Sequence, residues 1–253
     1  MISSTCNPKS SQQFLLDNVA FYGRTFDEYI EMFNFQANDW VGKKVLDCAS
    51  GPSSFTAEAN RNGIHAVACD PRYSELSESL IPLAENDMRK CLAKVGQQVH
   101  LFDALADNNK SHYLAEKAHA VFTFSNDYTE GKKEGRYIAA SLPELPFADN
   151  SFDLVLNAHL LFLYSSKNYG GVFEKDEFSM SFHIQAISEL IRVSKWEVRI
   201  YPLKGPNSTD NPMLSRVLEV ISQDSSLTIS LVPVNYKDIA GANLMLRIQK
   251  QRS

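Results

Sequence analysis

Two acidic residues of the chain lie where they could hold a ligand. Asp47 ends an apolar run that starts at Val45, and a turn of small residues around Gly51 follows it. Asp70 ends a second apolar run, which starts at Ile64. In an open α/β sheet, small residues after one strand let the backbone approach a ligand, and an acid at the tip of the next strand accepts hydrogen bonds from both hydroxyls of a ribose. The pattern predicts a ligand that contains a nucleoside.

His159 is the candidate for a catalytic role. It follows the apolar run 152–156 in the sequence Asn157-Ala158-His159-Leu160. The carboxyl end of such a strand faces the reaction centre of an open α/β sheet, and a neutral imidazole accepts a hydroxyl proton near neutral pH. The alternative is a histidine packed under the following helix with its hydrogen bonds satisfied. The sequence leaves both interpretations open.

Other kinds of site are disfavoured. The dinucleotide fingerprint Gly-x-Gly-x-x-Gly is missing, because Gly51 is the only glycine between Gly42 and Gly63. Tyr113 and Lys117 have the spacing of the catalytic pair of short-chain dehydrogenases, but this is also the spacing of any helix face. The histidines and the cysteines, at positions 6, 48, 69 and 91, show no metal-ligand spacing, so we predict reduced thiols and no metal.

The elements that must position these residues alternate between strands and helices, as in a doubly wound α/β sheet. Strands are expected at residues 45–47, 64–70, 137–141, 152–156, 197–203, 227–231 and 244–248. Helices are expected at residues 12–21, 26–35, 55–62, 73–95, 110–128, 184–193 and 212–221, and residues 129–136 are expected to form a loop. The helix at 26–35 begins with a capping box, in which Thr25 and Glu28 exchange hydrogen bonds.

At these residues the chain resembles the class I S-adenosylmethionine-dependent methyltransferases. Their first motif is an acid followed by Gly-x-Gly-x-Gly, and the corresponding residues here are Asp47, Ala49, Gly51 and Ser53. Ala49 and Ser53 are small, so they still allow a close approach to the ligand. A second segment, residues 145–156, resembles the turn into the fourth strand of the family.

The resemblance runs from about residue 40 to the C-terminus, apart from an insertion at about 76–135. It implies a Rossmann-like, doubly wound α/β fold with a seven-stranded, mostly parallel sheet and an antiparallel terminal strand. N-terminal helices at 11–36 would cover the cofactor, and the helical insertion would complete a single methyltransferase domain, residues 1–253. We expect the insertion and the linker 164–181 to form the cover on the substrate side.

The resemblance also implies S-adenosylmethionine as cofactor and S-adenosylhomocysteine as product. Asp70 would hold the ribose, Gly51 would lie next to the methionine moiety, and Tyr22 or Arg24 would meet its carboxylate. In the family the third strand commonly ends in an Asp that contacts adenine, whereas Ser141 stands here. The other residues expected to contact the cofactor are Asp47, Ala49, Ser53, Pro71, Leu142 and Asn157.

The acceptor is predicted to be a small molecule. The Asn/Asp-Pro-Pro-Tyr signature of amino-group methylation in nucleobases and glutamine is not found after the fourth predicted strand. The net charge of −5 gives no general basic surface for a nucleic acid, so we expect no nucleic-acid partner. No apolar run of 18 residues and no leader segment occurs, so we expect a soluble, cytoplasmic enzyme without a membrane partner.

A second function remains possible from the sequence alone. The glycine-poor turn and Ser141 would also suit a protein of this fold that binds S-adenosylmethionine or S-adenosylhomocysteine without transferring a methyl group. The acceptor, the methylated atom and the oligomeric state are not determined by the sequence.

Overall fold

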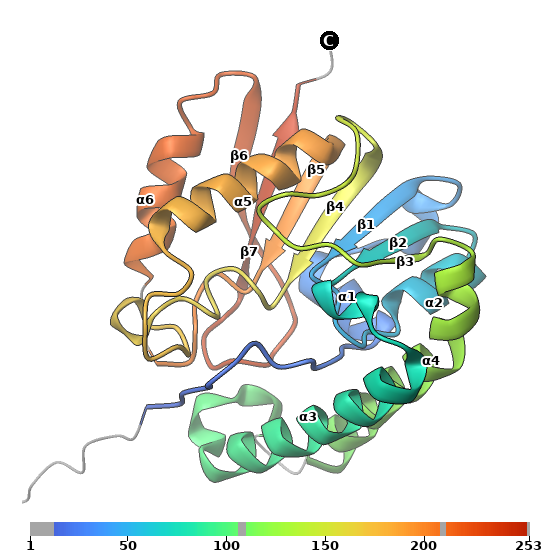
Figure 1. Ribbon diagram of the computed structural model, residues 1–253. Helices are drawn as coiled ribbons and strands as arrows, with labels where there is room; N and C mark the ends of the chain where they lie inside the picture. The colour runs from blue at the N-terminus through green and yellow to red at the C-terminus, as the bar shows by residue number, and fades with distance from the viewer. Residues whose placement is uncertain (1–12, 106–109, 208–210, 252–253) are drawn as a thin grey trace, which may run out of the picture.

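The computed structural model describes residues 13–105, 110–207 and 211–251. Within these residues, seven strands form one sheet in the order β3-β2-β1-β4-β5-β7-β6 (Figure 1). The strands are β1 (Lys44–Cys48), β2 (His65–Cys69), β3 (Tyr137–Ile138), β4 (Phe152–Ala158), β5 (Ser194–Tyr201), β6 (Leu227–Pro233) and β7 (Leu244–Lys250). The last strand, β7, runs antiparallel to its neighbours β5 and β6, and the other pairs are parallel. The predicted fold is therefore confirmed.

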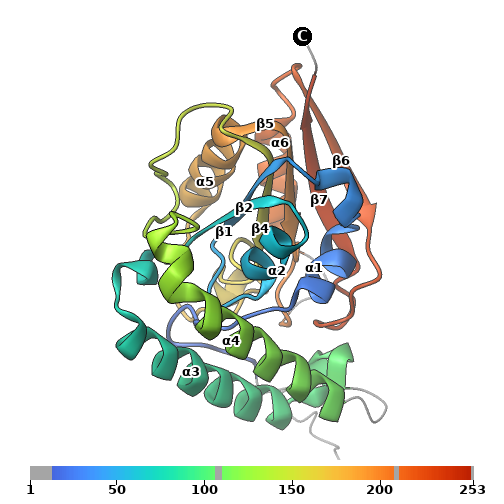
Figure 2. The ribbon, with the colours of Figure 1, turned by 90° about the vertical axis from the view of Figure 1, so that its right-hand side faces the viewer.

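Helices pack on both faces of the sheet. Helices α5 (Met180–Val193) and α6 (Pro212–Ile221) lie on one face, and α1 (Phe26–Phe33) and α2 (Phe55–Arg61) lie on the other (Figure 2). The insertion forms two long helices, α3 (Ser77–Gln97) and α4 (Lys110–Lys133), which lie side by side. Short 3-10 helices occur at η1 (Ala37–Trp40), η2 (Pro71–Ser74), η3 (Val99–Leu101), η4 (Asp103–Leu105) and η5 (Lys167–Tyr169).

Local sequence signals explain where several helices begin. The capping box predicted for α1 is present, because the side chain of Thr25 accepts a hydrogen bond from the backbone of Glu28 and the Glu28 carboxylate accepts one from the backbone of Thr25. Asn211 caps α6, and Pro212 occupies its first turn. Strands β1 and β4 are buried along almost their whole length, as parallel strands covered on both faces should be.

The helix predicted at 12–21 is wrong in its described part, residues 13–21, and Gln12 lies outside the described residues. Residues 13–25, which we call the strap, are instead extended apart from a bridge and a bend. The N–H of Leu16 donates to the carbonyl of Val172 at 2.8 Å, and the side-chain amide of Asn207 bonds both backbone groups of Phe14. Tertiary partners thus satisfy backbone groups that a helix would have satisfied internally.

Several element boundaries differ from the prediction, and the largest differences are at the end of α4 and in β3. Residues 129–133, predicted as loop, continue α4, because Tyr128 and Lys132 bond the carbonyl of Glu75 and hold the last turns of the helix against the sheet edge. The third strand spans two residues, Tyr137–Ile138, and not the predicted 137–141.

The insertion packs on the rest of the fold and on the strap. Its apolar residues form a second cluster with Phe21 of the strap and Ala68 of β2. The insertion contributes Leu80, Ala84, Val121, Phe124 and Tyr128 to this cluster, and Tyr73 of η2 joins it. The insertion thus shares its apolar core with the sheet.

Candidate functional site

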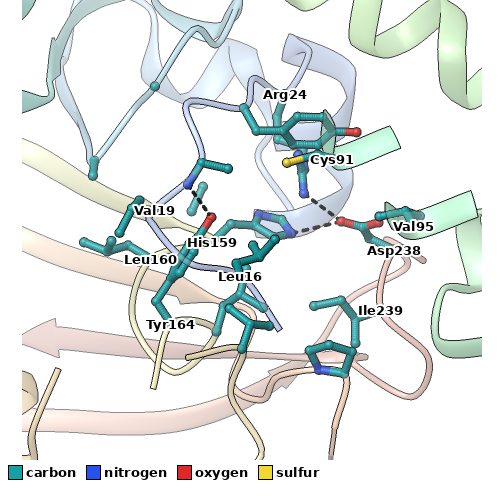
Figure 3. A pocket seen from close by; sticks show the side chains of 18 of the residues that line it. Leu16, Val19, Arg24, Cys91, Val95, His159, Leu160, Tyr164, Asp238 and Ile239 are labelled. Atoms are coloured by element: carbon teal, nitrogen blue, oxygen red, sulfur yellow. Dashed lines mark hydrogen bonds and ion pairs between the residues drawn. The ribbon is translucent and has the colours of Figure 1, made fainter. Parts of the chain in front are cut away.

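Two adjacent cavities lie beneath the strap at the carboxyl ends of β1, β2 and β4. They share five lining residues, Val19, Ala20, Ala49, Asp70 and Leu160. The outer cavity has a volume of about 520 Å³, and its other lining residues include Pro71, Arg72, Ser141, Leu142, Phe178 and Phe182. The inner cavity is smaller, about 90 Å³, and its lining includes Tyr22, Arg24, Gly51, Tyr113, His159 and Asp238 (Figure 3). Most of the sequence-predicted site residues therefore meet here.

The strap crosses both cavities and is fixed on two sides. Its Ala20 N–H donates to the hydroxyl of Tyr164 at 3.0 Å, in the linker after β4. Its Phe21 N–H donates to Asp87 of α3 at 3.1 Å. A Cβ on Gly23 would lie 2.1 Å from the carbonyl oxygen of Pro52, so only glycine allows the strap to pack on the turn after β1.

Asp70 ties the second strand to the turn after the first. Its carboxylate accepts hydrogen bonds from the backbone N–H groups of Gly51, at 3.1 Å, and Arg72, at 2.9 Å. Each bond uses a different oxygen, so each oxygen keeps a lone pair for a further donor. Burial raises the pKa of Asp70. Gly51 has φ +57°, a left-handed conformation that favours glycine.

Three predicted contact residues line neither cavity and support the turn from behind. Asp47 is fully buried and accepts hydrogen bonds from the hydroxyls of Tyr29, at 2.9 Å, and Ser50, at 2.7 Å. Burial raises the pKa of Asp47 to about 7. Ser53 donates to the carbonyl of Arg24 at 3.0 Å, and Asn157 donates to the carbonyl of Cys48 at 2.6 Å. These residues shape the turn from inside the fold.

Asp238 is the centre of a buried polar cluster at one end of the inner cavity. Its carboxylate lies 2.8 Å from Arg24 Nη2, 3.2 Å from His159 Nε2 and 3.4 Å from the hydroxyl of Tyr113 (Figure 3). Burial alone would raise the pKa of Asp238, but Arg24 and His159 hold it well below its ordinary value. The sequence analysis missed this residue, because nothing in the loop between β6 and β7 marks it as functional.

His159 has an unusual backbone and an unusual environment. Its φ of +54° is rare for a residue with a side chain, and such strain concentrates at functional sites. Both of its ring nitrogens are buried and have no hydrogen-bond partner among the described residues, although Nε2 lies 3.2 Å from the carboxylate of Asp238. Burial and the nearby Arg24 lower the pKa of His159 to about 4, so the imidazole is neutral at pH 7. The catalytic role of His159 stays a prediction.

A second buried ion pair adjoins this cluster. The ammonium of Lys117 contacts Glu28 Oε1, which also lies 3.9 Å from Arg24 Nε. Burial lowers the pKa of Lys117 to about 8. The hydroxyl of Tyr113 lies 3.2 Å from that of Tyr22. The pair Tyr113 and Lys117 thus belongs to this buried network, in which Lys117 neutralises Glu28.

The described ranges contain no group of three or more His, Cys, Asp or Glu side chains that could hold a metal ion. Cys48, Cys69 and Cys91 are free and buried, and Cys6 lies outside the described residues. Across residues 13–105, 110–207 and 211–251, every helix is too short or too polar to span a membrane.

No family model matches the chain. An uncharacterized protein of Methanocaldococcus jannaschii, MJ0045, is 29% identical over 239 residues, which are 93% of this chain and 98% of that protein.

Solved structures with a similar arrangement include three methyltransferases. A SAM-dependent methyltransferase from Aquifex aeolicus has 13% identity and a TM-score of 0.38, over 88% of this chain and 92% of that one. Magnesium protoporphyrin IX methyltransferase from Synechocystis PCC 6803, with bound SAM, has 12% identity and a TM-score of 0.41, over 85% and 73%. The 1,6-didemethyltoxoflavin N1-methyltransferase from Burkholderia thailandensis, with its substrate and S-adenosylhomocysteine, has 12% identity and a TM-score of 0.41, over 89% and 78%.

At these identities and TM-scores, what the chain binds has to be inferred from its own residues. Its sheet has seven strands in the order β3-β2-β1-β4-β5-β7-β6 with an antiparallel last strand, as the resemblance in the first motif implies. The protein therefore has the fold of the class I S-adenosylmethionine-dependent methyltransferases.

Proposed function

We propose that the protein transfers a methyl group from S-adenosylmethionine to a small-molecule acceptor. The observation that carries the proposal is the pair of cavities that meet at Ala49, Asp70 and Leu160. The outer cavity has groups that could bind a nucleoside, and the inner cavity has a neutral histidine among its lining residues. A cofactor that reaches from the first into the second would present its methyl group at their junction.

The outer cavity suits the nucleoside half of the cofactor. Its volume of about 520 Å³ lies within the range of roughly 300–1,000 Å³ that small-molecule sites occupy. The free lone pairs of Asp70 would accept the two ribose hydroxyls. Ser141 and the Leu142 backbone, which line the same cavity, would contact adenine, with Pro71 beside it.

The inner cavity suits the methionine half at its polar end. Arg24 Nε is buried without a hydrogen-bond partner among the described residues, although the same guanidinium bonds Asp238 through Nη2. A carboxylate placed beside Gly51 and Tyr22 would satisfy this N–H. The residues present therefore fit the cofactor at both ends.

The bound cofactor supplies a methyl group on a sulfonium, which is already a good leaving group. The protein's task is then to hold the acceptor in line with the methyl group and to exclude water. The strap covers the junction of the cavities, because Val19 and Ala20 line both of them. His159 would take the proton of the acceptor.

Two measurements on the purified protein test the proposal. Mass spectrometry of the denatured sample should find S-adenosylmethionine or S-adenosylhomocysteine carried through purification, and calorimetry should give saturable binding of S-adenosylhomocysteine. Absence of binding at millimolar ligand would refute the proposal.

Binding without methyl transfer is the second candidate function. The observation that favours it is the glycine-poor turn, with Ala49 and Ser53 where the family has glycine, together with Ser141 in place of the acid that contacts adenine. Saturable binding of S-adenosylhomocysteine, with no methylation across a panel of phenols, alcohols, amines and thiols, would support this function over an enzyme.

A further inference from the structure

We infer that the methyl acceptor docks in a groove between the strap and α3, carries an anionic group, and enters the inner cavity where the strap meets Cys91. The inference rests on the proposed function and adds the site, the route and the charge of the acceptor. It draws on the sizes of the cavities, on the contacts between the strap and α3, and on the charges that line the groove.

The cofactor leaves no room for the acceptor in the inner cavity. The volume of this cavity is about 90 Å³, below the ~150 Å³ of an apolar cavity that binds benzene. The proposed function already places the methionine half of the cofactor there and the nucleoside half in the outer cavity. The acceptor must therefore dock outside both cavities and reach the methyl group from a neighbouring space.

A third cavity, which we call the groove, borders the other two. It has a volume of about 580 Å³ and is lined by strap residues 16–20 and by residues of α3 that include Asp87, Lys90, Cys91 and Lys94. It shares Val19 and Ala20 with both other cavities, and it shares Leu16 and Cys91 with the inner one. The groove thus lies next to the junction at which the methyl group would be presented.

Two hydrogen bonds, which we call the clamps, hold the strap on α3. The ammonium of Lys94 donates to the carbonyl of Leu15 at 3.0 Å, and the carboxylate of Asp87 accepts from the N–H of Phe21 at 3.1 Å. Asp87, Cys91 and Lys94 lie at i, i+4 and i+7, and therefore on one face of the helix. Cys91 lies between the clamps on this face.

Between the clamps, few polar contacts hold the strap. Asp17, Asn18 and Val19 form no hydrogen bond or ion pair with other residues of the described ranges, and the strap bends at the first two. The N–H of Ala20 bonds Tyr164, which belongs to the linker after β4 and not to α3. Release of the clamps would therefore be enough to separate the strap from Cys91 and to connect the groove with the inner cavity.

The charges of the groove favour an anionic acceptor. Its lining contains three cations and two carboxylates, Arg72, Lys90, Lys94, Asp17 and Asp87, although the chain has a net charge of −5. Outside the clamps, two cations remain against the carboxylate of Asp17. Lys90 has no ion-pair partner among the described residues, and Arg72 has Glu75 at 3.7 Å. A carboxylate or phosphate of the acceptor would pair with these cations.

The reaction of the Cys91 thiol with N-ethylmaleimide, read peptide by peptide with mass spectrometry, tests the route. Asp87→Ala removes one clamp and should speed labelling of Cys91 about tenfold or more, because it loses a hydrogen bond to a charged group. Asp87→Asn keeps an acceptor oxygen and should restore most of the wild-type rate. Glu85→Ala, which removes an exposed acid of α3 outside the groove, should leave the rate unchanged.

Cys48 and Cys69 are fully buried in the sheet and report global unfolding in the same sample. Their labelling should stay slow in all three variants. Equal labelling of Cys91 in Asp87→Ala and Glu85→Ala, or a rise at all three cysteines together, overturns the route.

Benzoate and benzamide test the docking site in protein saturated with S-adenosylhomocysteine. We expect benzoate to shift the backbone NMR signals of Lys90 and Ala93 and to bind at least about threefold more tightly than benzamide, since an exposed ion pair contributes modestly. Lys90→Met keeps the apolar stem and should abolish this preference, whereas Arg89→Met, a cation of α3 outside the groove, should keep it. Equal affinities for the two probes in the wild type overturn the anionic class, and a preference that survives Lys90→Met overturns the site.

The outcomes separate this inference from the proposed function. If S-adenosylhomocysteine binds but the thiol and probe experiments give the contrary results, the acceptor site is wrong and the proposed function stands. If S-adenosylhomocysteine does not bind, the proposed function itself fails.

Discussion

The carboxylate of Asp70 accepts a hydrogen bond from the backbone N–H of Gly51 at 3.1 Å. This bond fixes the turn after β1 to the tip of β2, so the residue proposed to hold the ribose also shapes the loop beside the methionine moiety. Replacing Asp70 therefore removes two contributions to binding at once.

We predict that Asp70→Ala weakens binding of S-adenosylhomocysteine at least tenfold, because hydrogen bonds to charged groups contribute about 1.5–3 kcal/mol each. Asp70→Asn keeps the shape and one acceptor oxygen, so it should lose less. Calorimetry on both variants measures the effect. Asp39→Ala is the control, because this acid is exposed and lines neither cavity. An unchanged affinity of Asp70→Ala for S-adenosylhomocysteine would refute the proposal that Asp70 holds the ribose.

The φ of +57° at Gly51 predicts which substitutions the turn accepts. Asn tolerates a left-handed backbone, whereas a β-branched residue is strained there by about 1–2 kcal/mol. Gly51→Val should therefore be less stable and bind S-adenosylhomocysteine more weakly than Gly51→Asn, as measured by urea unfolding and calorimetry. Gly96→Val, at an α3 position with open space around it, should leave ligand binding unchanged. Equal stability and equal ligand affinity of the two Gly51 variants would contradict the proposed position of Gly51 beside the methionine moiety.

The buried carboxyl of Asp47 predicts a pH dependence of stability. Its pKa is raised from 3.8 to about 7, so between these values the folded state holds a proton that the unfolded state releases. The contribution of Asp47 to stability is then fully present below the lower value and is lost as the pH rises through the upper one. Asp47→Asn should lack this loss, so its stability relative to the wild type should increase across the window.

Urea unfolding of the wild type and of Asp47→Asn at a series of pH values measures this difference. His159 acts in the opposite direction, because its lowered pKa reduces stability as the pH falls toward about 4. Both proteins contain His159, so its effect cancels in the comparison. Parallel stability curves would show that Asp47 is ionised in the folded state.

The ion pair of Lys117 and Glu28 predicts a non-additive pair of substitutions. Lys117→Met leaves a buried carboxylate without its closest cation and should cost about 3–5 kcal/mol. Adding Glu28→Gln removes that charge and keeps the capping box of α1, so the double variant should recover part of the loss. Thermal unfolding of the single and double variants measures the loss of stability in each. A double variant whose loss equals the sum of the two single losses would exclude the pairing.

Ligand binding should protect the cover of the site from hydrogen exchange. We expect S-adenosylhomocysteine to slow amide exchange in the strap and in the linker 164–181, because both lie against the cavities. Helix α6 lines neither cavity and is the internal control. No change in the strap or linker at saturating ligand would remove their role as a cover.

The features that the sequence predicted best are those determined by a few consecutive residues. The turn after β1, with Asp47 and Gly51, and the acid Asp70 are read from apolar runs that end in an acid or a glycine, and the structure brings Gly51 and Asp70 together. The pattern did not distinguish a residue that faces the ligand from one that supports the turn. Asp47 and Asp70 look alike in sequence, yet only Asp70 lines the cavities.

What the sequence did not reveal depends on contacts between distant residues. Asp238 meets Arg24 across 214 positions of the chain and has no local pattern of its own. The strap has enough apolar residues to suggest a helix, but its Phe14 and Phe21 pack in different apolar clusters, which an extended chain reaches and one short helix does not. Local propensity is a weak guide where tertiary partners satisfy the backbone.

The strap's attachments on both sides of the site also have a kinetic consequence. Ala20 is bonded to the linker after β4 and Phe21 to α3, so neither side of the cover separates without breaking a bond to the strap. Entry of the acceptor and escape of the methylated product then share one opening event. Turnover would be limited by that event once methyl transfer is fast, and rapid-mixing experiments should show no burst, because the first product would form no faster than the steady rate.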